Sequence, residues 1–301
     1  MVAWISKHQV ENTKKTYGTY AKKYKIFCEE RKLPLEDPAV ISQFLREGME
    51  KQNLSASTLN DVVACSISDI FRMDKVKPTH DPLVRETKKV IARLAKKGPG
   101  GKTPLPLKML EEFVQNVNPH RTNDIRDILL FIIMFGGLLR ESEAVALKNT
   151  DVWVVEGNLY IFVEKSKMDQ TRIGYTVVLA GSTTSSLCPT SWFNIYKKER
   201  EKLPGEYLFH NTSYPGRKLS AKRPNCLLKE WLKKIGVSEE DRKLYGSHSM
   251  RKGGATAAAR AKVRLHVLKR HGRWRSDAVY LYIVDDEEEI VAVSKAILGF
   301  E

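Results

Sequence analysis

The chain has 301 residues and a net charge of +15 at pH 7, and it is long enough to form two domains that each bury a core. The excess of positive charge favours a polyanionic partner, nucleic acid above all, over the alternative of a basic protein whose charge serves only solubility. Four scattered cysteines without a CxxC pair argue against a zinc site or a disulfide framework and for a reducing compartment, and the apolar run at residues 128–139 is too short to cross a membrane.

Residues 1–94 are predicted to form a helical domain of about four short helices. Two segments, residues 37–45 and 81–94, begin with Asp followed by Pro, which are preferred at the cap and the first turn of a helix. Serine caps and an apolar stripe indicate another helix within residues 55–71. A further helix is indicated by aromatic side chains at helical spacing, namely Tyr17, Tyr20, Tyr24 and Phe27.

A linker is predicted at residues 95–107, because this stretch holds three glycines, three prolines and three lysines. Such a composition interrupts a helix and gives a flexible, basic segment. It suits a strap that lies along phosphates, and an ordinary surface loop explains the composition equally well. The linker would separate the helical domain from a second domain at residues 108–301.

The second domain is predicted to be mixed. Residues 122–137 indicate a capped, buried helix, and residues 151–179 indicate three short strands with turns at 156–158 and around 168–174. Everything after about Cys188 is expected to return to helices. The predicted fold class is therefore mainly α with one small antiparallel sheet, an α+β arrangement rather than a Rossmann or barrel pattern.

Two short motifs contain cations that packing alone does not explain. Arg140 directly follows the buried helix, with Glu143 one turn further on. One interpretation is a buried ion pair between these two side chains that fixes the start of a helix. In GSHSMRKGGATAAARA, residues 246–261, His248 and Arg251 lie three residues apart on one face of a predicted helix, and the small residues that follow let that helix pack closely.

Arg140, His248 and Arg251 together resemble the Arg…His-x-x-Arg set of the tyrosine recombinases, the family of lambda integrase and Cre. The segment EKSKMDQTRIG resembles that family's strand-turn segment with a catalytic lysine, and HGRWRSDAVYLYI resembles its last motif, where a His or Trp precedes the nucleophilic tyrosine. The resemblance covers residues 104–301, and the N-terminal helices and linker are similar to the family's core-binding domain and strap. The last two motifs look most like recombinases of eukaryotic mobile elements of the Crypton and DIRS type.

The resemblance implies a site that binds a DNA phosphodiester. Transesterification puts extra negative charge on the non-bridging oxygens, and two guanidiniums can clamp these oxygens bidentately. Arg140 and Arg251 match those two positions. His248 and the Trp274 indole would donate further hydrogen bonds, and His248 would also handle the proton of the nucleophile. Glu143 matches an acidic position that braces the site.

The nucleophile of this family is a tyrosine, whose phenol forms a stable but reversible phosphoester. Tyr282, eight residues after Trp274, fits the shorter pattern of the eukaryotic elements, and Tyr280 is the alternative. A lysine on a mobile strand turn delivers a proton to the leaving 5′-oxygen. Lys167 aligns best with that lysine, and Lys165 is the alternative. No metal and no cofactor are expected, because the phosphotyrosine conserves the energy of the broken bond.

The expected activity is that of a site-specific DNA recombinase, which cleaves and rejoins strands through a covalent 3′-phosphotyrosine. A type IB topoisomerase with a similar residue set is one alternative, and a domesticated, non-catalytic DNA-binding protein is the other. The expected partner is double-stranded DNA that carries a recombination site, with no membrane. The expected location is the nucleus for a protein of a eukaryotic mobile element and the cytoplasm otherwise.

A final helix is predicted to begin after Asp285 or Asp286. It carries a stripe of apolar side chains, namely Ile290, Val293, Ile297 and Leu298. In one interpretation this helix folds back onto its own domain. The family resemblance favours the other interpretation, in which the helix docks on a neighbouring protomer and joins monomers into dimers and then a tetramer on DNA, while the free protein is largely monomeric.

Overall fold

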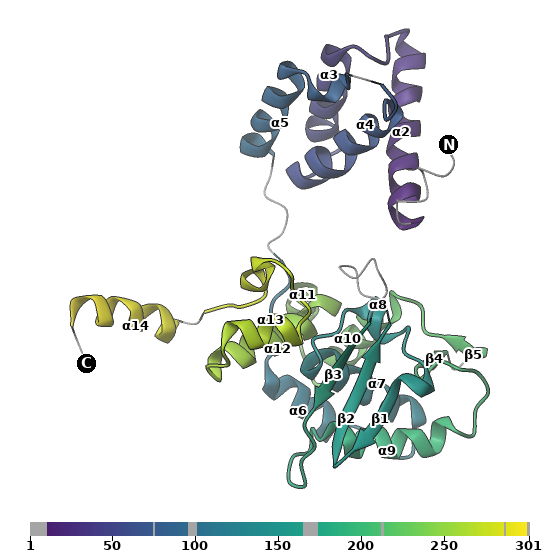
Figure 1. Cartoon of the computed structure of the whole chain (residues 1–301), viewed down its shortest axis with the longest axis vertical. Helices are drawn as coiled ribbons and strands as arrows, with labels where there is room; N and C mark the ends of the chain where they lie inside the picture. The colour runs from purple at the N-terminus through teal and green to yellow at the C-terminus, as the bar shows by residue number, and fades with distance from the viewer. Residues whose placement is uncertain are drawn as a thin grey trace. The chain divides into compact units, whose positions relative to one another are not determined.

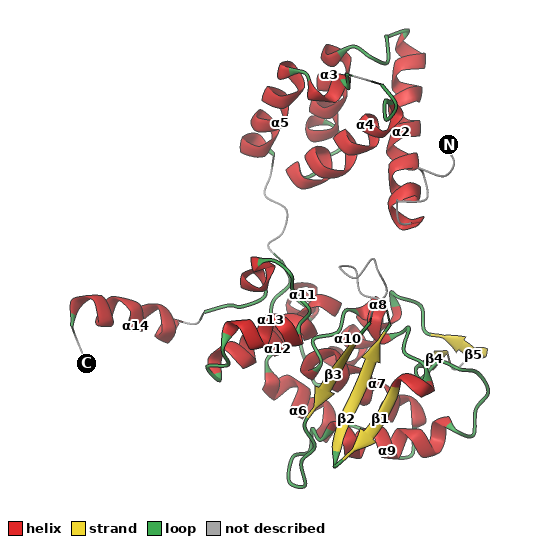
Figure 2. Cartoon of the chain, in the orientation of Figure 1, coloured by secondary structure: helices red, strands yellow, loops and turns green. Residues whose placement is uncertain are grey.

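The computed structural model describes residues 11–74, 76–95, 101–164, 174–211, 214–285 and 287–299. The chain divides into two compact units, Met1–Gly101 and Lys102–Glu301, each with its own internal contacts. Figure 1 labels the helices and strands, and Figure 2 shows that the strands belong to the second unit. Among the described residues, no helix combines the length and the apolar character that a membrane span requires.

The first unit is built from helices joined by short turns. In chain order these are α2 (Glu11–Arg31), α3 (Pro38–Glu50), the π-helical η2 (Thr58–Val63), α4 (Ala64–Ile70), the 3₁₀ turn η3 (Pro78–His80) and α5 (Pro82–Leu94). Their apolar faces meet in one core that includes Tyr24, Ile41, Leu45, Ile67 and Val84. The helical character predicted for this part of the chain is confirmed.

Local sequence signals set the start of two of these helices. The side chains of Asp37 and Asp81 accept hydrogen bonds from the backbone N–H groups of Ala39 and Leu83, both at 2.8 Å. A proline follows each Asp as the first helical residue. These are the predicted Asp-Pro starts, and they satisfy backbone donors that the first turn of a helix otherwise leaves without a partner.

The second unit combines helices with two small antiparallel sheets. In chain order its elements are α6 (Leu107–Gln115), α7 (Thr122–Gly136), α8 (Glu141–Ala144), η4 (Asn149–Asp151), β1 (Val152–Val155), β2 (Asn158–Val163), β3 (Tyr175–Leu179), α9 (Pro189–Arg200), β4 (His210–Asn211), β5 (Tyr214–Lys218), α10 (Arg223–Lys234), α11 (Glu239–Leu244), α12 (Ser247–Arg260), α13 (Leu265–His271), η5 (Asp277–Leu281) and α14 (Glu287–Leu298). The mainly helical α+β class predicted from the sequence is confirmed.

α7 runs through the core of the second unit, where every residue from Asp124 to Phe135 is buried. The predicted cap at its start is not formed, because Arg121 occupies the cap position and its side chain makes no capping bond. Asp124 in the first turn takes over part of this function. Its carboxylate accepts the backbone N–H of Asn118 at 3.2 Å and pairs with Lys234 at 2.9 Å, and a negative charge is favourable at this end of a helix.

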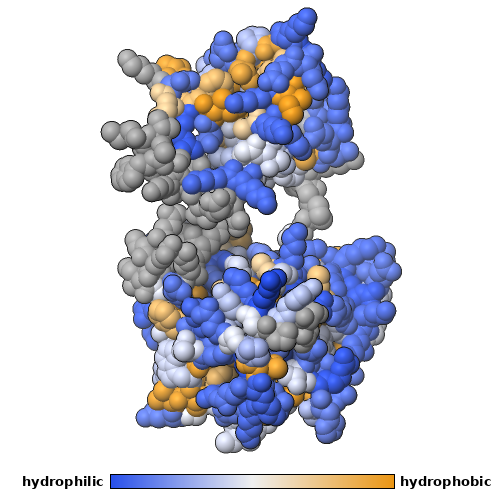
Figure 3. All heavy atoms as spheres, turned by 90° about the vertical axis from the view of Figure 1, so that its right-hand side faces the viewer, coloured by the Kyte–Doolittle hydropathy of each residue, from blue (hydrophilic) through white to orange (hydrophobic). Residues whose placement is uncertain are grey.

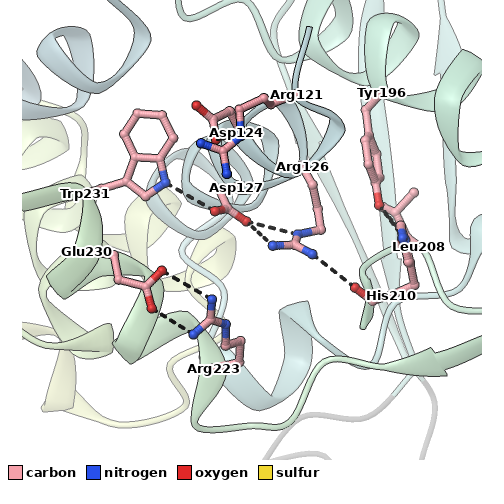
Figure 4. Close-up of polar contacts among 10 residues, drawn as sticks. All are labelled: Arg121, Asp124, Arg126, Asp127, Tyr196, Leu208, His210, Arg223, Glu230 and Trp231. Carbon is pink, nitrogen blue, oxygen red and sulfur yellow. Dashed lines mark hydrogen bonds and ion pairs between the residues drawn. The ribbon is translucent and has the colours of Figure 1, made fainter. Parts of the chain in front are cut away.

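A buried polar network fixes α7 to the elements around it (Figure 4). The Arg126 guanidinium donates to Asp127 Oδ1 at 2.9 and 2.7 Å and to the His210 carbonyl at 3.3 Å. Trp231 Nε1 donates to Asp127 Oδ2 at 3.2 Å, and the Tyr196 hydroxyl lies 3.1 Å from His210 Nδ1. Because buried polar groups are costly unless they are paired, this network tolerates few alternative positions of α7.

The larger sheet has the strand order β1-β2-β3, with both neighbouring pairs antiparallel, as predicted. Glu156 and Gly157 form the first turn with φ values of +48° and +78°. Two left-handed residues are what a two-residue hairpin turn requires, and they bring Val155 opposite Asn158. Along β2 buried and partly exposed residues alternate, so one face of the sheet belongs to the core.

The prediction that only helices follow Cys188 is wrong. β4 pairs with β5 in a short antiparallel hairpin, and the Leu219 backbone N–H donates to the Phe209 carbonyl at 3.0 Å. A strand of two residues is too short to produce a visible alternation of apolar and polar residues. The hairpin depends instead on tertiary contacts of Phe209 and His210, both of which are buried.

α12 packs closely against α7 through two glycines. A side-chain carbon added to Gly253 would collide with the Leu105 carbonyl and the Phe135 ring, and one added to Gly254 would collide with the Phe135 carbonyl. The predicted close packing of this helix is therefore confirmed. The segment before α6 also contacts the start of α12, where the Leu105 backbone N–H donates to the Ser249 carbonyl at 2.9 Å.

The boundary between the two units falls at Gly101, within the residues assigned to the linker. Thr103 donates its backbone N–H to the Leu244 carbonyl at 3.0 Å, and Lys102 Nζ donates to the Lys243 carbonyl at 2.7 Å. Residues 102–106 thus belong to the second unit by their contacts.

Candidate active site

Arg140 lies just beyond the C-terminal end of α7. The chain turns there through Gly137 and Leu138, and Leu138 has a φ of +49°. The Arg140 backbone N–H donates to Glu143 Oε2 at 3.0 Å, and its Nη1 donates to Oε1 at 2.7 Å. The ion pair offered as one interpretation of this motif is present, and it fixes the start of α8.

Glu143 is a buried carboxylate that two arginines share. Its side chain is 3 % exposed, and it pairs with Arg140 at 2.7 Å and with Arg273 Nη2 at 2.8 Å. Burial opposes ionisation, but the positive charges of Arg273 and Arg140 outweigh it and hold the pKa of Glu143 below its usual range. The carboxylate is therefore ionised at neutral pH and holds both guanidiniums in place.

α12 begins at Ser247 and carries His248 and Arg251 near its start. His248 is exposed, whereas the side chain of Arg251 is among the largest that are fully buried. Arg251 Nη1 donates to the Leu138 carbonyl, and Nη2 donates to the Gly272 carbonyl at 2.6 Å. A guanidinium has five N–H donors, and within the described chain its Nε–H has no partner. Arg251 thus keeps donors for a bound group.

Two aromatic rings cover the Arg251 guanidinium. Its central carbon lies 4.3 Å from the centroid of the Trp274 ring and 5.3 Å from that of Tyr282, and the two ring centroids are 5.1 Å apart. The Trp274 Nε1–H is buried and has no hydrogen-bond partner among the described residues. Tyr280 is 59 % exposed. The structure therefore brings Tyr282, and not Tyr280, against Arg251 and Trp274.

Positive charge exceeds negative charge at this point of the molecule. Burial, together with the charges of Arg140 and Arg273, lowers the pKa of Arg251 to about 9. Arg251 is still protonated at neutral pH, so three guanidiniums repel one another around Glu143. An anion bound here would reduce this repulsion, and a phosphodiester offers acceptor oxygens that match planar guanidiniums.

Arg273 belongs to this cluster, and sequence reasoning missed it. It directly precedes Trp274, but Arg270 and Arg275 lie close by in the sequence, and no sequence pattern distinguishes the three. The structure does distinguish them, because the Arg273 side chain is 6 % exposed and pairs with Glu143, whereas the other two arginines are exposed.

The sequence model of the "Phage integrase family" matches residues 105–287, well over half of the chain. The chain belongs to the phage integrase family. This is the family of tyrosine recombinases that the sequence motifs resemble, so the predicted enzyme class, site-specific recombinases that cleave and rejoin DNA, is confirmed at the level of the family.

Known members and solved structures agree with this assignment. An "Integrase/recombinase xerD homolog" of Selenomonas ruminantium is 23% identical over 289 residues, which cover 93% of this chain and 83% of that protein. The Tn1549 transposon integrase in complex with transposon right end DNA has a TM-score of 0.66 at 17% identity, covering 97% of this chain and 95% of that one. A lambda integrase dimer bound to a COC′ core site has a TM-score of 0.61 at 19% identity, covering 95% and 76%. At these identities the solved structures establish the common integrase fold.

Lys167 and Lys165, the two predicted proton donors, lie outside the described residues of this phage integrase family chain. The strands on either side of them are described, since β2 ends at Val163 and β3 begins at Tyr175. The role of either lysine therefore stays a prediction.

A polar cavity of about 550 Å³ lies along α7 and α10, away from this cluster. Its lining includes Lys234, which pairs with Asp124 at 2.9 Å. It also includes Arg223, which pairs with Glu230 at 2.8 Å (Figure 4). The α7 residues that line the cavity, such as Asp124 and Asp127, belong to the N-terminal half of that helix. Arg140 follows its C-terminal end, so the cavity adds no group to the candidate site. In the part of the chain that the structure describes, no three His, Cys, Asp or Glu side chains are grouped as a metal site.

The surface of the protein is rich in charge. Figure 3 shows one face on which hydrophilic residues predominate over both units, with smaller apolar groups between them. The whole chain has 51 Lys and Arg residues against 36 Asp and Glu residues. Such an excess of cations favours binding to a phosphate backbone independently of its sequence.

Proposed function

We propose that this chain cleaves and rejoins double-stranded DNA with Tyr282 as the nucleophile, through a covalent 3′-phosphotyrosine. The observation that carries the proposal is the packing of the Tyr282 and Trp274 rings on the Arg251 guanidinium. Family membership supports the class of reaction, and the position of Tyr282 supports the choice of this residue over the exposed Tyr280.

In the proposed reaction the Tyr282 oxygen attacks the scissile phosphorus and displaces the 5′-oxygen, so that one P–O bond forms as another breaks. Negative charge develops on the non-bridging oxygens, and Arg140 and Arg251 bind these oxygens through their remaining N–H donors. His248 accepts the proton of the tyrosine. The buried Trp274 Nε1–H donates a further hydrogen bond, and an indole cannot titrate near neutral pH.

The displaced 5′-oxygen takes its proton from Lys167, with Lys165 as the alternative. The phosphotyrosine conserves the energy of the broken bond, so a 5′-hydroxyl can later attack it and restore the phosphodiester. The side chains named here supply each proton transfer, and the proposed reaction is complete with them.

The proposed assembly uses α14 to join protomers on DNA. Its apolar side chains are exposed by between 60 and 77 %, namely Ile290, Val293, Ile297 and Leu298. This exposure supports docking on a neighbouring protomer over packing of the helix on its own unit, since a stripe of this kind is stable only when it is covered. Lambda integrase, a solved relative, was captured as a dimer on its core site. We extend the proposal to dimers and a tetramer on DNA.

The nucleophile is tested with a duplex that contains a site recovered from random-sequence DNA by selection with this protein. A nick beyond the cleavage point lets the broken strand diffuse away and traps the covalent complex. Tyr282→Phe is expected to abolish the trapped complex and to leave duplex binding nearly intact, because the change removes one hydroxyl. Tyr280→Phe is the matched control and should react like the wild type. Trapping by Tyr282→Phe, with loss in Tyr280→Phe, would reverse the assignment.

A supercoil-relaxation assay and the trapping assay separate the alternative functions. A type IB topoisomerase relaxes supercoiled plasmid as a monomer and without a specific site, whereas the proposed recombinase needs paired sites. A domesticated, non-catalytic protein binds the duplex and forms no covalent complex at all. The presence of the arginines, His248 and Tyr282 favours the catalytic interpretation.

A narrower origin is also part of the proposal. The GRWRSDAVYLYI segment and the spacing of eight residues between Trp274 and Tyr282 support a place among recombinases of eukaryotic mobile elements of the Crypton and DIRS type. A nuclear location would follow from that origin, and a cytoplasmic one otherwise.

A further inference from the structure

We infer that Arg273 is a positioning residue for the recombination reaction, which ties Arg140 and Arg251 together through the Glu143 carboxylate and the Leu138 carbonyl. The inference rests on the proposed function, in which those two arginines bind the scissile phosphate. It adds a residue that lies outside the Arg…His-x-x-Arg set, and it assigns that residue a role that acts through Arg140.

The first connection between Arg273 and Arg140 is the Glu143 carboxylate, which accepts hydrogen bonds from both. Arg273 Nη2 donates to Glu143 Oε2 at 2.8 Å, and Arg140 Nη1 donates to the other oxygen, Oε1, at 2.7 Å. Both Arg273 and Glu143 are nearly inaccessible, with side chains 6 % and 3 % exposed. A carboxylate that is buried between two guanidiniums in this way has little freedom to rotate, so Arg273 fixes the oxygen that orients Arg140.

The second connection, between Arg273 and Arg251, is the backbone of the turn between α7 and α8. Arg273 donates to the Gly137 carbonyl at 3.2 Å and to the Leu138 carbonyl at 3.0 Å. The Leu138 carbonyl also accepts Nη1 of Arg251. Leu138 has a φ of +49°, which is unfavourable for a branched side chain, so the turn needs support from outside. One guanidinium thus supports the turn two residues before Arg140 and shares an acceptor with Arg251.

The charge of Arg273 also matters to Arg140. Without Arg273, Glu143 Oε2 would lose a charged partner and keep the Arg140 backbone N–H, so it could also accept from the Arg140 guanidinium. A bidentate ion pair would then occupy N–H donors that the phosphate needs. Arg273 neutralises part of the carboxylate and leaves Arg140 with donors for the substrate. This predicts that the damage caused by removing Arg273 depends on the charge of Glu143, which a purely structural role does not predict.

The test uses the selected, nicked duplex and measures the single-turnover rate of covalent complex formation, the duplex Kd and the melting temperature. Arg273→Gln is expected to slow the covalent step about 10- to 100-fold, as expected for a small misplacement of a reacting group, with a Kd within about twofold of the wild type. Arg273→Lys keeps the charge but not the fork, so its rate should lie between the two. Arg275→Gln removes an exposed arginine two residues away and should react like the wild type.

Two readouts separate positioning from mere stability. The double variant Arg273→Gln, Glu143→Gln should react no more slowly than Arg273→Gln alone, because the two changes break the same link. A duplex with a methyl group in place of one non-bridging oxygen carries no charge at the scissile phosphate, so it needs less from Arg140. Two isomers of this duplex exist, because the methyl group can replace either non-bridging oxygen. The isomer that restores the reaction rate of Arg140→Ala should also restore that of Arg273→Gln. Additive losses, or an unchanged loss on both isomers, would overturn the inference.

The outcomes also separate this inference from the function on which it rests. A wild-type protein that forms no covalent complex, or a Tyr282→Phe variant that still forms one, refutes the proposed function. A wild-type protein that reacts, together with an Arg273→Gln variant that reacts equally fast, refutes the role of Arg273 alone. If Arg273→Gln does not fold, Arg273→Lys carries the same comparison, and its loss should disappear on the same methylated isomer.

Discussion

Arg140 and Arg251 would bind the same phosphate, but their surroundings differ. The side chain of Arg140 is 15 % exposed and forms an ion pair with one carboxylate, that of Glu143. Arg251 is buried, faces two aromatic rings and donates to two backbone carbonyls. Desolvation strengthens the hydrogen bonds that such a guanidinium makes to an anion. We therefore expect Arg251 to be the less replaceable of the two.

Arg251→Lys is expected to slow covalent complex formation by about a hundred- to a thousandfold, the loss found when one donor to a developing oxyanion is removed. An ammonium is a point charge and cannot donate to two carbonyls and a phosphate with the geometry of a fork. The rate on the trapping duplex measures the loss, and Arg270→Lys, at an exposed arginine, is the control. A near-normal rate would count against bidentate binding of the phosphate by the Arg251 guanidinium.

We expect His210 to make folding stability depend on pH. Burial, followed by the charges of Arg126 and Arg200, lowers the pKa of this ring to about 4, against about 6.5 in an unfolded chain. Between these values the unfolded state binds the proton and the folded state does not. The free energy of unfolding is therefore highest above pH 6.5 and falls as the pH drops toward 4, by up to about 3 kcal/mol.

Denaturant titrations between pH 7 and pH 4 measure this dependence. His210→Gln is expected to have a flatter profile than the wild type, although its stability at pH 7 should be lower because the ring packs in the core. His120→Gln, at an exposed histidine, should follow the wild-type profile. A His210→Gln variant that loses stability as steeply as the wild type would show that another group is responsible.

At the scale of elements, α12 and α14 represent opposite cases. α12 is held by close contacts, because Gly253 and Gly254 leave no room for a side chain between it and α7. α14 carries an apolar stripe that is exposed throughout its described length. The first helix positions His248 and Arg251, and we propose that the second docks on a neighbouring protomer.

The double substitution Ile290→Asp, Ile297→Asp is expected to leave a folded monomer that binds one half-site and loses cooperative assembly. Charges on the stripe would prevent its burial on a neighbour. Gel shifts on single and paired half-sites, with melting curves, measure both effects. Ala292→Asp with Lys295→Gln changes the net charge equally on the opposite side of the helix and should assemble normally. If the Ile variant unfolds, α14 belongs to the core of its own unit, and docking on a neighbouring protomer is refuted.

At the scale of the whole molecule, each unit has a core of its own. The sequence predicts a core-binding domain in residues 1–94 and a catalytic domain in residues 108–301, and we propose that both domains bind one duplex. Two linked modules gain affinity because the second contact becomes intramolecular. Contacts of many Lys and Arg side chains with phosphates also make binding depend steeply on salt.

A protein of residues 102–301 alone is expected to fold and to bind the selected duplex at least about tenfold more weakly than the full chain. Its affinity should also fall less steeply with NaCl concentration, because fewer phosphates are contacted. Fluorescence anisotropy at several salt concentrations measures both quantities. Equal affinity and an equal salt slope would refute the proposal that both domains bind one duplex.

Features that depend on neighbouring residues could be predicted from the sequence. Local preferences, which act within a few residues, account for the helix starts at Asp37 and Asp81, the turn at residues 156–158 and the presence of three short strands. The spacing of His248 and Arg251 on one helix also follows from local geometry. The resemblance of four motifs to one family then connected segments that no local rule could join.

Tertiary packing selects which of several similar side chains enter the site. Tyr280 and Tyr282 are both plausible in sequence, and packing on Arg251 separates them. Arg273 stands among exposed arginines, and its proposed role depends on Glu143, 130 residues earlier in the chain. Burial and pairing are set by segments that are distant in sequence, because a side chain's surroundings exist only once those segments have packed together.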